Sequence, residues 1–272
     1  PYLSTVCLAA NALLVHATEQ QRAEWLTPIA AGEYTATLAY TSAGTRWSAQ
    51  DVTVTWRKVE DGFELNGEYR YVADGHSADW LVLAAREEGS SGLEGIRLFW
   101  VEGNAEGLSR EAVATMDETR KQATISCSQL HVAAERVVGE IEIEAGPALA
   151  TVIDLATICV AADQVGGAQQ ALDSTLAYTR ERVQFGRTIA SFQAVKHKAA
   201  DMMLKVESAR SLMLYAACTA DAWLRDAVDD TTLREAAAMV ASSAGDAAFF
   251  VTGTGLQLHG GVGITEIGRA HV

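Results

Sequence analysis

The stretch Tyr178-Thr-Arg-Glu-Arg-Val-Gln-Phe-Gly-Arg-Thr-Ile-Ala-Ser-Phe-Gln-Ala-Val-Lys-His-Lys-Ala-Ala-Asp201 places a charged and aromatic turn between two long apolar segments. Arg182, Phe185 and Gly186 fall where one helix is expected to end and the next to begin. A guanidinium offers a rigid fork of donors for phosphate oxygens, an aromatic ring offers a flat face, and glycine lets a ligand approach the backbone. This combination predicts a nucleotide site. The alternative is an ordinary helix corner, in which Arg182 pairs with a surface carboxylate and Phe185 packs between the helices.

The residues that follow this turn predict one long helix. Its apolar side chains recur at alternating steps of three and four, which places them on one stripe. The stripe consists of Phe192, Val195, Ala199, Met202, Val206, Ala209, Met213, Ala216, Ala220 and Trp223. With helices predicted over residues 152–179 and 233–252, the stripe indicates an antiparallel bundle, and we assign it to the core rather than to a cofactor.

Between residues 33 and 144 the apolar period changes to two, which indicates a β domain. Val52, Val54 and Trp56 alternate with threonines, as in a strand with one covered face. Asn66-Gly67, between two short apolar runs, predicts a tight hairpin. Two more strands are expected at residues 80–85 and 96–101.

Residues 1–31 have apolar side chains near the helical period and predict helix. The expected organisation is therefore α+β in three parts. These are the end of an N-terminal helical domain (1–32), a central β domain (33–145) and a C-terminal helical bundle (146–272).

The composition limits the partners of the chain. Its 272 residues include 21 Lys plus Arg and 35 Asp plus Glu, which gives a net charge of −14 and no block of five basic residues. Such a chain is not expected to bind nucleic acid. We also expect no membrane span and no secretory signal, and therefore a cytoplasmic protein. Four widely spaced cysteines, without a Cys-x-x-Cys pair, predict buried and reduced thiols.

Familiar catalytic and nucleotide motifs are absent from the sequence. No third glycine completes a dinucleotide fingerprint, no Gly-Lys-Ser/Thr loop occurs and no Gly-x-Ser-x-Gly elbow occurs. The six histidines show no metal-ligand spacing, so no metal site is predicted. Gly260-Gly261 alone would predict a helix C-cap.

Three motifs together resemble the acyl-CoA dehydrogenase family. The first is Arg-x-Gln-Phe-Gly at residues 182–186, followed by Phe192-Gln-Ala-Val and Ala200-Asp-Met. The second is Gln257-Leu-His-Gly-Gly-Val-Gly-Ile-Thr265, and the third is the N-terminal segment 17–33. The resemblance implies the acyl-CoA dehydrogenase fold, in which the first two motifs hold the adenosine and pyrophosphate end of an FAD bound mainly by a neighbouring subunit.

The resemblance also implies roles for individual residues. Arg182 would bind pyrophosphate and Phe185 would pack on the adenosine part. Polar side-chain and backbone contacts would come from Gln193, Gln257, Gly260 and Gly261. In the family, a carboxylate takes the α-proton of an acyl-CoA thioester and the β-hydrogen leaves as hydride to the flavin.

The match is uneven where the chain's own flavin and thioester would lie. The family has a Thr-Glu-Pro segment and a Gly-Ser-Asp turn where this chain has Thr41-Ser-Ala-Gly-Thr-Arg-Trp-Ser48. It has Trp-Ile-Thr where this chain has Tyr71-Val-Ala73, and one branch has its base where this chain has Ala156, followed by Thr157 in place of arginine. The other branch has its base in a later Glu-Gly turn that we do not identify before Val272. Glu266 lies too close to the glycine motif for that role, and no catalytic residue is assigned.

These differences lead to one hypothesis and two alternatives. The chain is similar to subunits of heteromeric (α2β2) acyl-CoA dehydrogenases that act on steroid side-chain CoA thioesters. It would complete the FAD site of a homologous partner in a tetramer that passes electrons to an electron-transfer acceptor. The alternatives are a homotetrameric dehydrogenase with its base in a C-terminal tail, and a structural subunit that binds no flavin.

Overall fold

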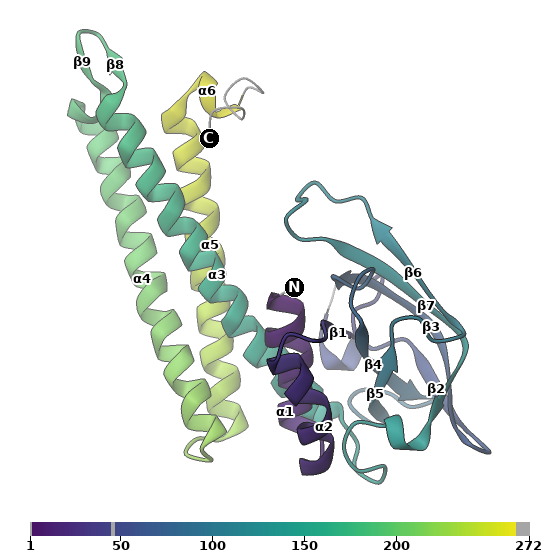
Figure 1. The fold of residues 1–272 in the computed structure, drawn as a ribbon. Coiled ribbons are helices and arrows are strands. Elements are labelled where there is room, and N and C mark those ends of the chain that lie inside the picture. Colours follow the sequence, from purple (N-terminus) through teal and green to yellow (C-terminus); the bar gives the residue numbers. More distant parts are fainter. Residues whose placement is uncertain (1, 45–46, 265–272) are drawn as a thin grey trace. The chain divides into compact units, whose positions relative to one another are not determined.

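The computed structural model describes residues 2–44 and 47–264, and these residues form two compact units (Figure 1). Unit 1 comprises residues 1–156 and unit 2 comprises residues 157–272. The division falls inside helix α3 (Gly146–Glu181), which begins one residue after the boundary that the sequence suggested. The three-part division at 1–32, 33–145 and 146–272 stays a prediction.

Unit 1 begins with helices, as the sequence predicted. A π-helix (Leu3–Ala10) continues into α1 (Asn11–His16), and α2 (Glu19–Ala30) follows. Thr18 separates the two α-helices because it caps the second one. Its hydroxyl accepts a hydrogen bond from the Gln21 amide at 3.2 Å, and the Gln21 side chain accepts one from the Thr18 amide at 3.1 Å. This reciprocal pair is a capping box, which fixes the start of α2.

A mixed sheet of seven strands forms the rest of unit 1. The strands are β1 (Ala36–Ala39), β2 (Thr55–Val59), β3 (Gly62–Ala73), β4 (Trp80–Glu87), β5 (Ile96–Glu102), β6 (Leu108–Val113) and β7 (Gln122–Ala133). Their order is β1-β4-β2-β3-β7-β6, with β5 also paired with β4. Strand β4 is parallel to β1 and β2, and the other pairs are antiparallel. The strands predicted at residues 80–85 and 96–101 are confirmed as β4 and β5.

The hairpin predicted at Asn66-Gly67 is wrong. Strand β3 runs without a break through this pair, and the chain turns earlier, just before Gly62. The Asn66 side chain accepts a hydrogen bond from the Gln129 amide at 2.8 Å, and Gly67 (φ 135°) packs against the backbone of Val54. The pairing of β3 with β7 shifts register here. Asn66 lies opposite a bulge in β7, where Ser128 and Gln129 (φ 50°) face this one residue, so Asn-Gly lies inside β3 rather than in a turn.

The alternation at residues 52–56 predicted the buried face correctly and the start of the strand incorrectly. Val52, Val54 and Trp56 are all buried, whereas Thr53 is exposed. Strand β2 nevertheless begins only at Thr55, which is its first residue paired with both β3 and β4.

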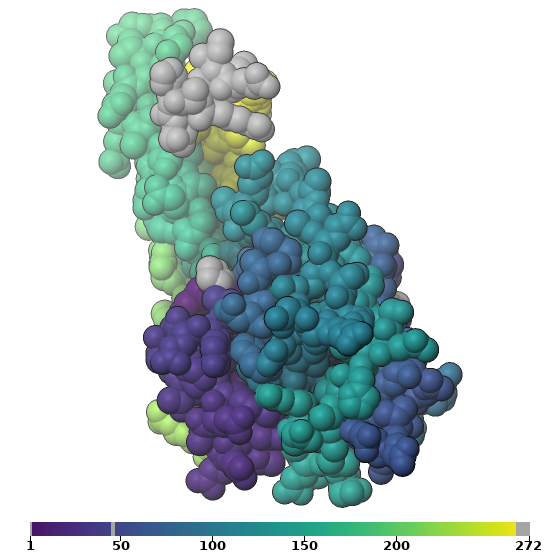
Figure 2. All heavy atoms as spheres, turned by 45° about the vertical axis from the view of Figure 1, so that its right-hand side comes forward, coloured from purple at the N-terminus to yellow at the C-terminus, as the bar shows by residue number. Residues whose placement is uncertain are grey.

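The sheet is covered on both faces, and β4 contributes to each. Leu81 and Leu83 belong to one apolar cluster, and Val82 and Ala84 belong to the other. The second cluster includes side chains of the N-terminal helices, which lie against the β domain in the space-filling view (Figure 2, purple). Within this cluster, the ring of Trp25 from α2 stacks on the ring of Trp100 from β5, with ring centroids 5.4 Å apart.

Unit 2 contains three long helices. After α3 come a two-stranded hairpin, β8 (Val183–Gln184) and β9 (Arg187–Thr188), and then α4 (Gln193–Leu224), α5 (Asp230–His259) and the short α6 (Gly261–Ile264). Four side chains of the predicted stripe are buried, which confirms its assignment to the core at Met202, Val206, Ala209 and Ala216, and the other six are half-buried. Met202 and Val206 of this stripe pack with Leu172 of α3 and Val251 of α5.

Helices α3 and α5 are long and apolar enough to cross a membrane by length and composition. Core helices of soluble proteins satisfy the same two criteria, and both helices contribute to the core of the bundle. Length and composition therefore assign neither helix to a membrane.

All four cysteines are free. Cys7 and Cys127 are buried, and burial raises the pKa of the Cys127 thiol to about 12. Cys159 is half-buried, and Cys218 is exposed. The prediction of buried thiols is therefore wrong for Cys218, because it lies on α4 outside the buried stripe.

Replacing Gly62 by alanine tests the tight turn into β3. Gly62 has φ 146°, and an added Cβ would lie against the carbonyl oxygen of Val132. Gly89 is the matched control, because it also has positive φ (87°) but no atom within 4 Å of an added Cβ. We expect Gly62→Ala to lower the free energy of unfolding by about 3 kcal/mol, and Gly89→Ala by about 1 kcal/mol.

Tryptophan fluorescence during urea unfolding measures this difference, since five of the six tryptophans belong to unit 1. Equal losses in the two variants would contradict the packing described for Gly62.

Candidate functional site

The corner between α3 and α4 is built by a small hairpin that the sequence did not predict. The Arg182 amide donates to the Tyr178 carbonyl at 2.9 Å and so extends the last turn of α3. The Ile189 amide then donates to the Arg182 carbonyl at 2.8 Å, which closes the hairpin. At its tip Phe185 and Gly186 have φ of 55° and 76°. Two successive residues with positive φ are typical of the tight turn that suits hairpin twist, and glycine adopts this conformation without strain.

The side chains at this corner present a cation and an aromatic face to the outside. Phe185 is 92% exposed, so it does not plug the corner between the helices. Its ring lies nearly perpendicular to that of Phe192, with ring centroids 6.3 Å apart, and the Arg187 guanidinium lies over the Phe192 ring, 4.0 Å from its centroid. Arg182 is exposed, and its guanidinium has no hydrogen-bond or ion-pair partner among residues 2–44 and 47–264. The alternative of an ordinary helix corner, in which Arg182 is paired and Phe185 is packed between the helices, does not agree with this geometry.

A second turn, at the end of α5, lies at the same end of the bundle as the hairpin (Figure 1). Gly260 is the C-cap with φ 63°, and its amide donates to the Gln257 carbonyl at 3.1 Å. The Gln257 side chain accepts a hydrogen bond from Lys198 Nζ of α4 at 2.7 Å. An added Cβ at Gly260 or Gly261 would meet no atom within 4 Å. The backbone of this turn is therefore open to a ligand from outside.

Tyr178 and His259 join the two turns. Their rings stack with centroids 4.4 Å apart and an interplanar angle of 22°. The Tyr178 hydroxyl also donates to the His259 carbonyl at 3.4 Å. Tyr178 lies one helical turn before Arg182, and His259 directly precedes Gly260. The contact thus brings the basic corner and the glycine turn together.

The six predicted residues therefore divide into three places within unit 2. Arg182 and Phe185 lie at the corner, and Gln257, Gly260 and Gly261 form the opposing turn. The exposed residue Gln193 begins α4, and among residues 2–44 and 47–264 its side chain has no hydrogen bond to either turn. Whether these residues bind a cofactor stays a prediction.

Sequence reasoning missed three residues that organise this end of the bundle, namely Tyr178, Lys198 and His259. Tyr178 and Lys198 lie in the stretch 178–201, and His259 lies in the second motif, so the sequence located them without identifying their contacts. Helical spacing shows which residues share a face, but not which residue of another helix they meet.

The charge at this end is opposite to that of the whole chain. Residues 180–201 contain five arginines and lysines against two acidic residues, although the net charge of the chain is −14. Local positive charge with an unpaired guanidinium suits a polyanion such as a diphosphate. Exposed Phe185 suits a planar base, and the open glycine turn suits a ligand that contacts backbone amides. The residues present thus fit the phosphate and adenosine end of a dinucleotide.

The positions that correspond to a flavin and thioester site of the chain itself lie in unit 1 and along α3. The Thr41 hydroxyl donates to the Arg70 carbonyl, so it serves the sheet. Tyr71 has φ 61° at a register shift of β3, and its ring contacts Trp47 at 5.9 Å. Ala73 has no hydroxyl to offer, and its carbonyl accepts from Thr37 at 2.7 Å.

The candidate positions for a base contain no carboxylate in the described part of the chain. Ala156 is buried on α3, and Thr157 beside it is half-buried. Glu266 lies outside the described residues, as do Thr45, Arg46 and the end of the second motif. No group of three or more metal-binding side chains occurs among residues 2–44 and 47–264.

Known proteins match almost the whole chain. Residues 147–271 match the family described as acyl-CoA dehydrogenase, C-terminal domain. The short-chain specific acyl-CoA dehydrogenase of Megasphaera elsdenii is 32% identical over 268 residues, which are 97% of this chain and 67% of the relative. The caffeyl-CoA reductase-Etf complex subunit CarC of Acetobacterium woodii is 30% identical over 270 residues, 96% of this chain and 68% of the relative.

Solved structures share the fold. The structure of a steroid ACAD variant, Tcur3481-Tcur3483, superposes with a TM-score of 0.82 at 29% identity. It covers 98% of this chain, which spans 67% of that structure's chain. The predicted arrangement of a β domain with a C-terminal helical domain is confirmed.

Replacing Gly255 by alanine tests the close approach of α3 and α5 beneath the two turns. An added Cβ would lie 2.7 Å from the Thr175 hydroxyl, which is buried and donates to the Ala171 carbonyl at 2.7 Å. We expect a loss of about 2 kcal/mol in the free energy of unfolding, because the helices must separate. At Gly253, on the same helix, an added Cβ meets no atom within 4 Å. Gly253→Ala should therefore stabilise the helix by about 0.5–1 kcal/mol.

Circular dichroism at 222 nm during urea unfolding follows the helices. The double variant Gly255→Ala/Thr175→Ala should recover part of the loss, since it removes the clashing hydroxyl. A Gly255→Ala protein as stable as Gly253→Ala would contradict the proposed contact.

Proposed function

Because the chain belongs to the acyl-CoA dehydrogenase family, we propose that it is one subunit of a heteromeric, FAD-dependent acyl-CoA dehydrogenase. In this proposal its bundle end completes the FAD site of a homologous partner subunit. The observation that carries the proposal is the Arg182 guanidinium, which has no partner among residues 2–44 and 47–264, on the same hairpin as the exposed ring of Phe185 and at the same end as the open glycine turn.

Family membership confirms the predicted enzyme class, an oxidoreductase that acts on CH–CH bonds, and the predicted cofactor, FAD. When bound, FAD supplies the redox chemistry by accepting the β-hydrogen of the acyl thioester as hydride. The substrate proposed for the complex is an acyl-CoA thioester, and the complex would pass its electrons to an electron-transfer acceptor. The relative from Acetobacterium woodii is named as a subunit of a complex with Etf, which supports an acceptor of that kind.

The role of Arg182 is electrostatic in this proposal. Its planar fork can donate two parallel hydrogen bonds to diphosphate oxygens, and no carboxylate in the described part of the chain competes for it. Phe185 would pack on the adenosine part with its exposed ring. Gln193 and Gln257 would donate or accept at polar edges of the dinucleotide, and Gly260 and Gly261 would offer backbone amides.

The same chain offers little to a catalytic centre of its own. A base for α-proton removal must be a carboxylate in a dry pocket, whose pKa is raised into the neutral range. Ala156 and Thr157 cannot act in this way, and Ala73 lacks a hydroxyl where the family has threonine. We therefore assign no catalytic residue to this chain, and in the proposed complex the partner supplies the base.

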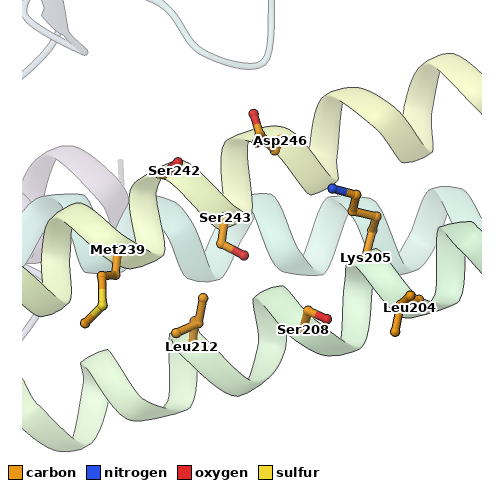
Figure 3. A pocket seen from close by; sticks show the side chains of 8 residues that line it. All are labelled: Leu204, Lys205, Ser208, Leu212, Met239, Ser242, Ser243 and Asp246. Carbon is orange, nitrogen blue, oxygen red and sulfur yellow. The ribbon is translucent and has the colours of Figure 1, made fainter.

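Exposed apolar side chains on the bundle support association with another subunit. Between α4 and α5 lies an open groove of about 590 Å³, lined by Leu204, Lys205, Ser208, Leu212, Met239, Ser242, Ser243 and Asp246 (Figure 3). The side chain of Leu204 is 68% exposed. Phe249 of α5, which does not line the groove, is 85% exposed. Large apolar side chains that are exposed on neighbouring helices are typical of a protein interface. We propose a tetramer with two copies of a homologous subunit.

The substrate class proposed is the CoA thioester of a steroid side chain. It is supported by the resemblance of the sequence to heteromeric subunits and by the likeness to the steroid ACAD Tcur3481-Tcur3483. The proposed location is the cytoplasm. Reduction of the bound flavin by steroid and by short-chain acyl-CoA thioesters, mixed separately with the complex, distinguishes the substrate classes.

Purification of the chain alone and together with its partner tests the division of roles. The lone chain is expected to hold no stoichiometric FAD, and the complex is expected to hold one FAD for each pair of subunits. One FAD for each lone chain would contradict the proposal and favour a homotetrameric dehydrogenase. A complex that binds FAD solely within partner subunits would favour a structural role.

Replacing Arg182 by alanine measures the predicted diphosphate contact. We expect the affinity of the complex for FAD to fall by about 2 kcal/mol, or about thirtyfold, as for the loss of one partner from a desolvated charged contact. Arg180→Ala is the matched control, since Arg180 is an exposed arginine of the same corner and should leave the affinity unchanged. Isothermal titration of the apo complex with FAD gives both values. Equal affinities for the two variants would remove Arg182 from the site.

A further inference from the structure

We infer that Tyr178 and His259 are positioning residues that hold Arg182 and the glycine turn Gly260–Gly261 at the spacing needed by one dinucleotide. The inference rests on the proposed function and deepens it. Neither side chain is assigned a contact with the ligand. Each acts through the backbone of a neighbouring residue.

The first part of the proposed arrangement connects Tyr178 to Arg182. The Tyr178 carbonyl accepts the Arg182 amide at 2.9 Å, so the two residues belong to one rigid turn at the end of α3. The Arg182 carbonyl in turn accepts the Ile189 amide, which anchors the returning strand of the hairpin. A displacement of the Tyr178 ring would therefore move the basic corner as a unit.

The second half connects His259 to the glycine turn. His259 Nδ1 lies 2.8 Å from the Gly255 carbonyl, and since a carbonyl only accepts, Nδ1 carries the proton. This bond fixes the ring plane that stacks on Tyr178. The Tyr178 hydroxyl donates to the His259 carbonyl, immediately before Gly260. The stack thus fixes both the ring and the backbone from which the turn starts.

Lys198 adds a third link, from α4. Its ammonium donates to the Gln257 side chain at 2.7 Å, one turn before the end of α5. The three long helices are therefore tied together at this one end by contacts outside the buried core cluster, since Tyr178, Lys198 and His259 are only half-buried. Groups that are already in place bind a ligand more tightly, because less conformational entropy is lost on binding.

The affinity of the assembled complex for FAD tests the inference. Tyr178→Leu removes the ring stack and should weaken FAD binding three- to tenfold, the scale of a lost aromatic pair. Tyr178→Phe keeps the stack and loses only the long hydroxyl contact, so it should recover the affinity to within about threefold. Trp223→Leu is the control, because it removes an aromatic side chain at the opposite end of α4 and should leave FAD binding unchanged.

Coupling between the two rings distinguishes positioning from general stability. Because both rings belong to one contact, Tyr178→Leu and His259→Gln should each weaken FAD binding. The double variant should lose no more affinity than the single variant with the larger loss. His259→Gln also keeps the inference testable if Tyr178→Leu fails to fold. The thermal midpoint of each complex shows whether the helices stay assembled.

The outcomes separate this inference from the proposed function. If Arg182→Ala binds FAD as tightly as the unmodified complex, the proposed function fails and the inference fails with it. If Arg182→Ala weakens binding but folded Tyr178→Leu does not, or if the two ring variants have additive effects, the positioning inference alone is overturned.

Discussion

The close approach of α3 and α5 is the constraint on which the candidate site depends. Gly255 leaves room for the buried Thr175 hydroxyl, and one turn further along, the Tyr178 ring lies on His259. Residues 81 positions apart in the sequence thereby come into hydrogen-bond contact. A larger residue at Gly255 would separate the helices, and the basic corner and the glycine turn would no longer share one end. Close helix packing therefore determines whether two separate motifs can act on a single ligand.

Much of this end of the molecule could be predicted from the sequence because its signals are local. Alternating steps of three and four located the buried stripe of α4, and Arg182, Phe185 and Gly186 predicted a helix corner with polar and aromatic groups. The β8–β9 hairpin could not be predicted in this way, because its strands are only two residues long. The partners of Tyr178 and Lys198 depend on how the helices pack, which periodicity does not specify.

The misplaced hairpin in the β domain has a similar cause. Asn-Gly favours the positive φ values of a tight hairpin turn, but of this pair only Gly67 has positive φ (135°), and the pair lies inside β3. The Asn66 side chain instead accepts a hydrogen bond from the backbone amide of Gln129 on the neighbouring strand β7, and this contact holds Asn66 within the sheet. A local pattern thus predicted a turn where pairing with a neighbouring strand keeps the chain extended. The same limit applies to Cys218, which lies in an apolar stretch but on the outer side of α4.

The proposed division of roles follows from the contrast between the two regions. Within the described part of the chain, the bundle end has a cation without a partner, an exposed ring and an open turn. The positions that would serve the chain's own flavin and thioester instead present Ala73, Ala156 and Thr157. A subunit with this distribution can contribute to a cofactor site without supplying a base. The most direct measurement is a structure of the assembled complex with FAD bound. The account predicts the Arg182 guanidinium about 3 Å from a diphosphate oxygen of an FAD held by the partner subunit. A corner that faces bulk solvent, far from any FAD, would contradict it.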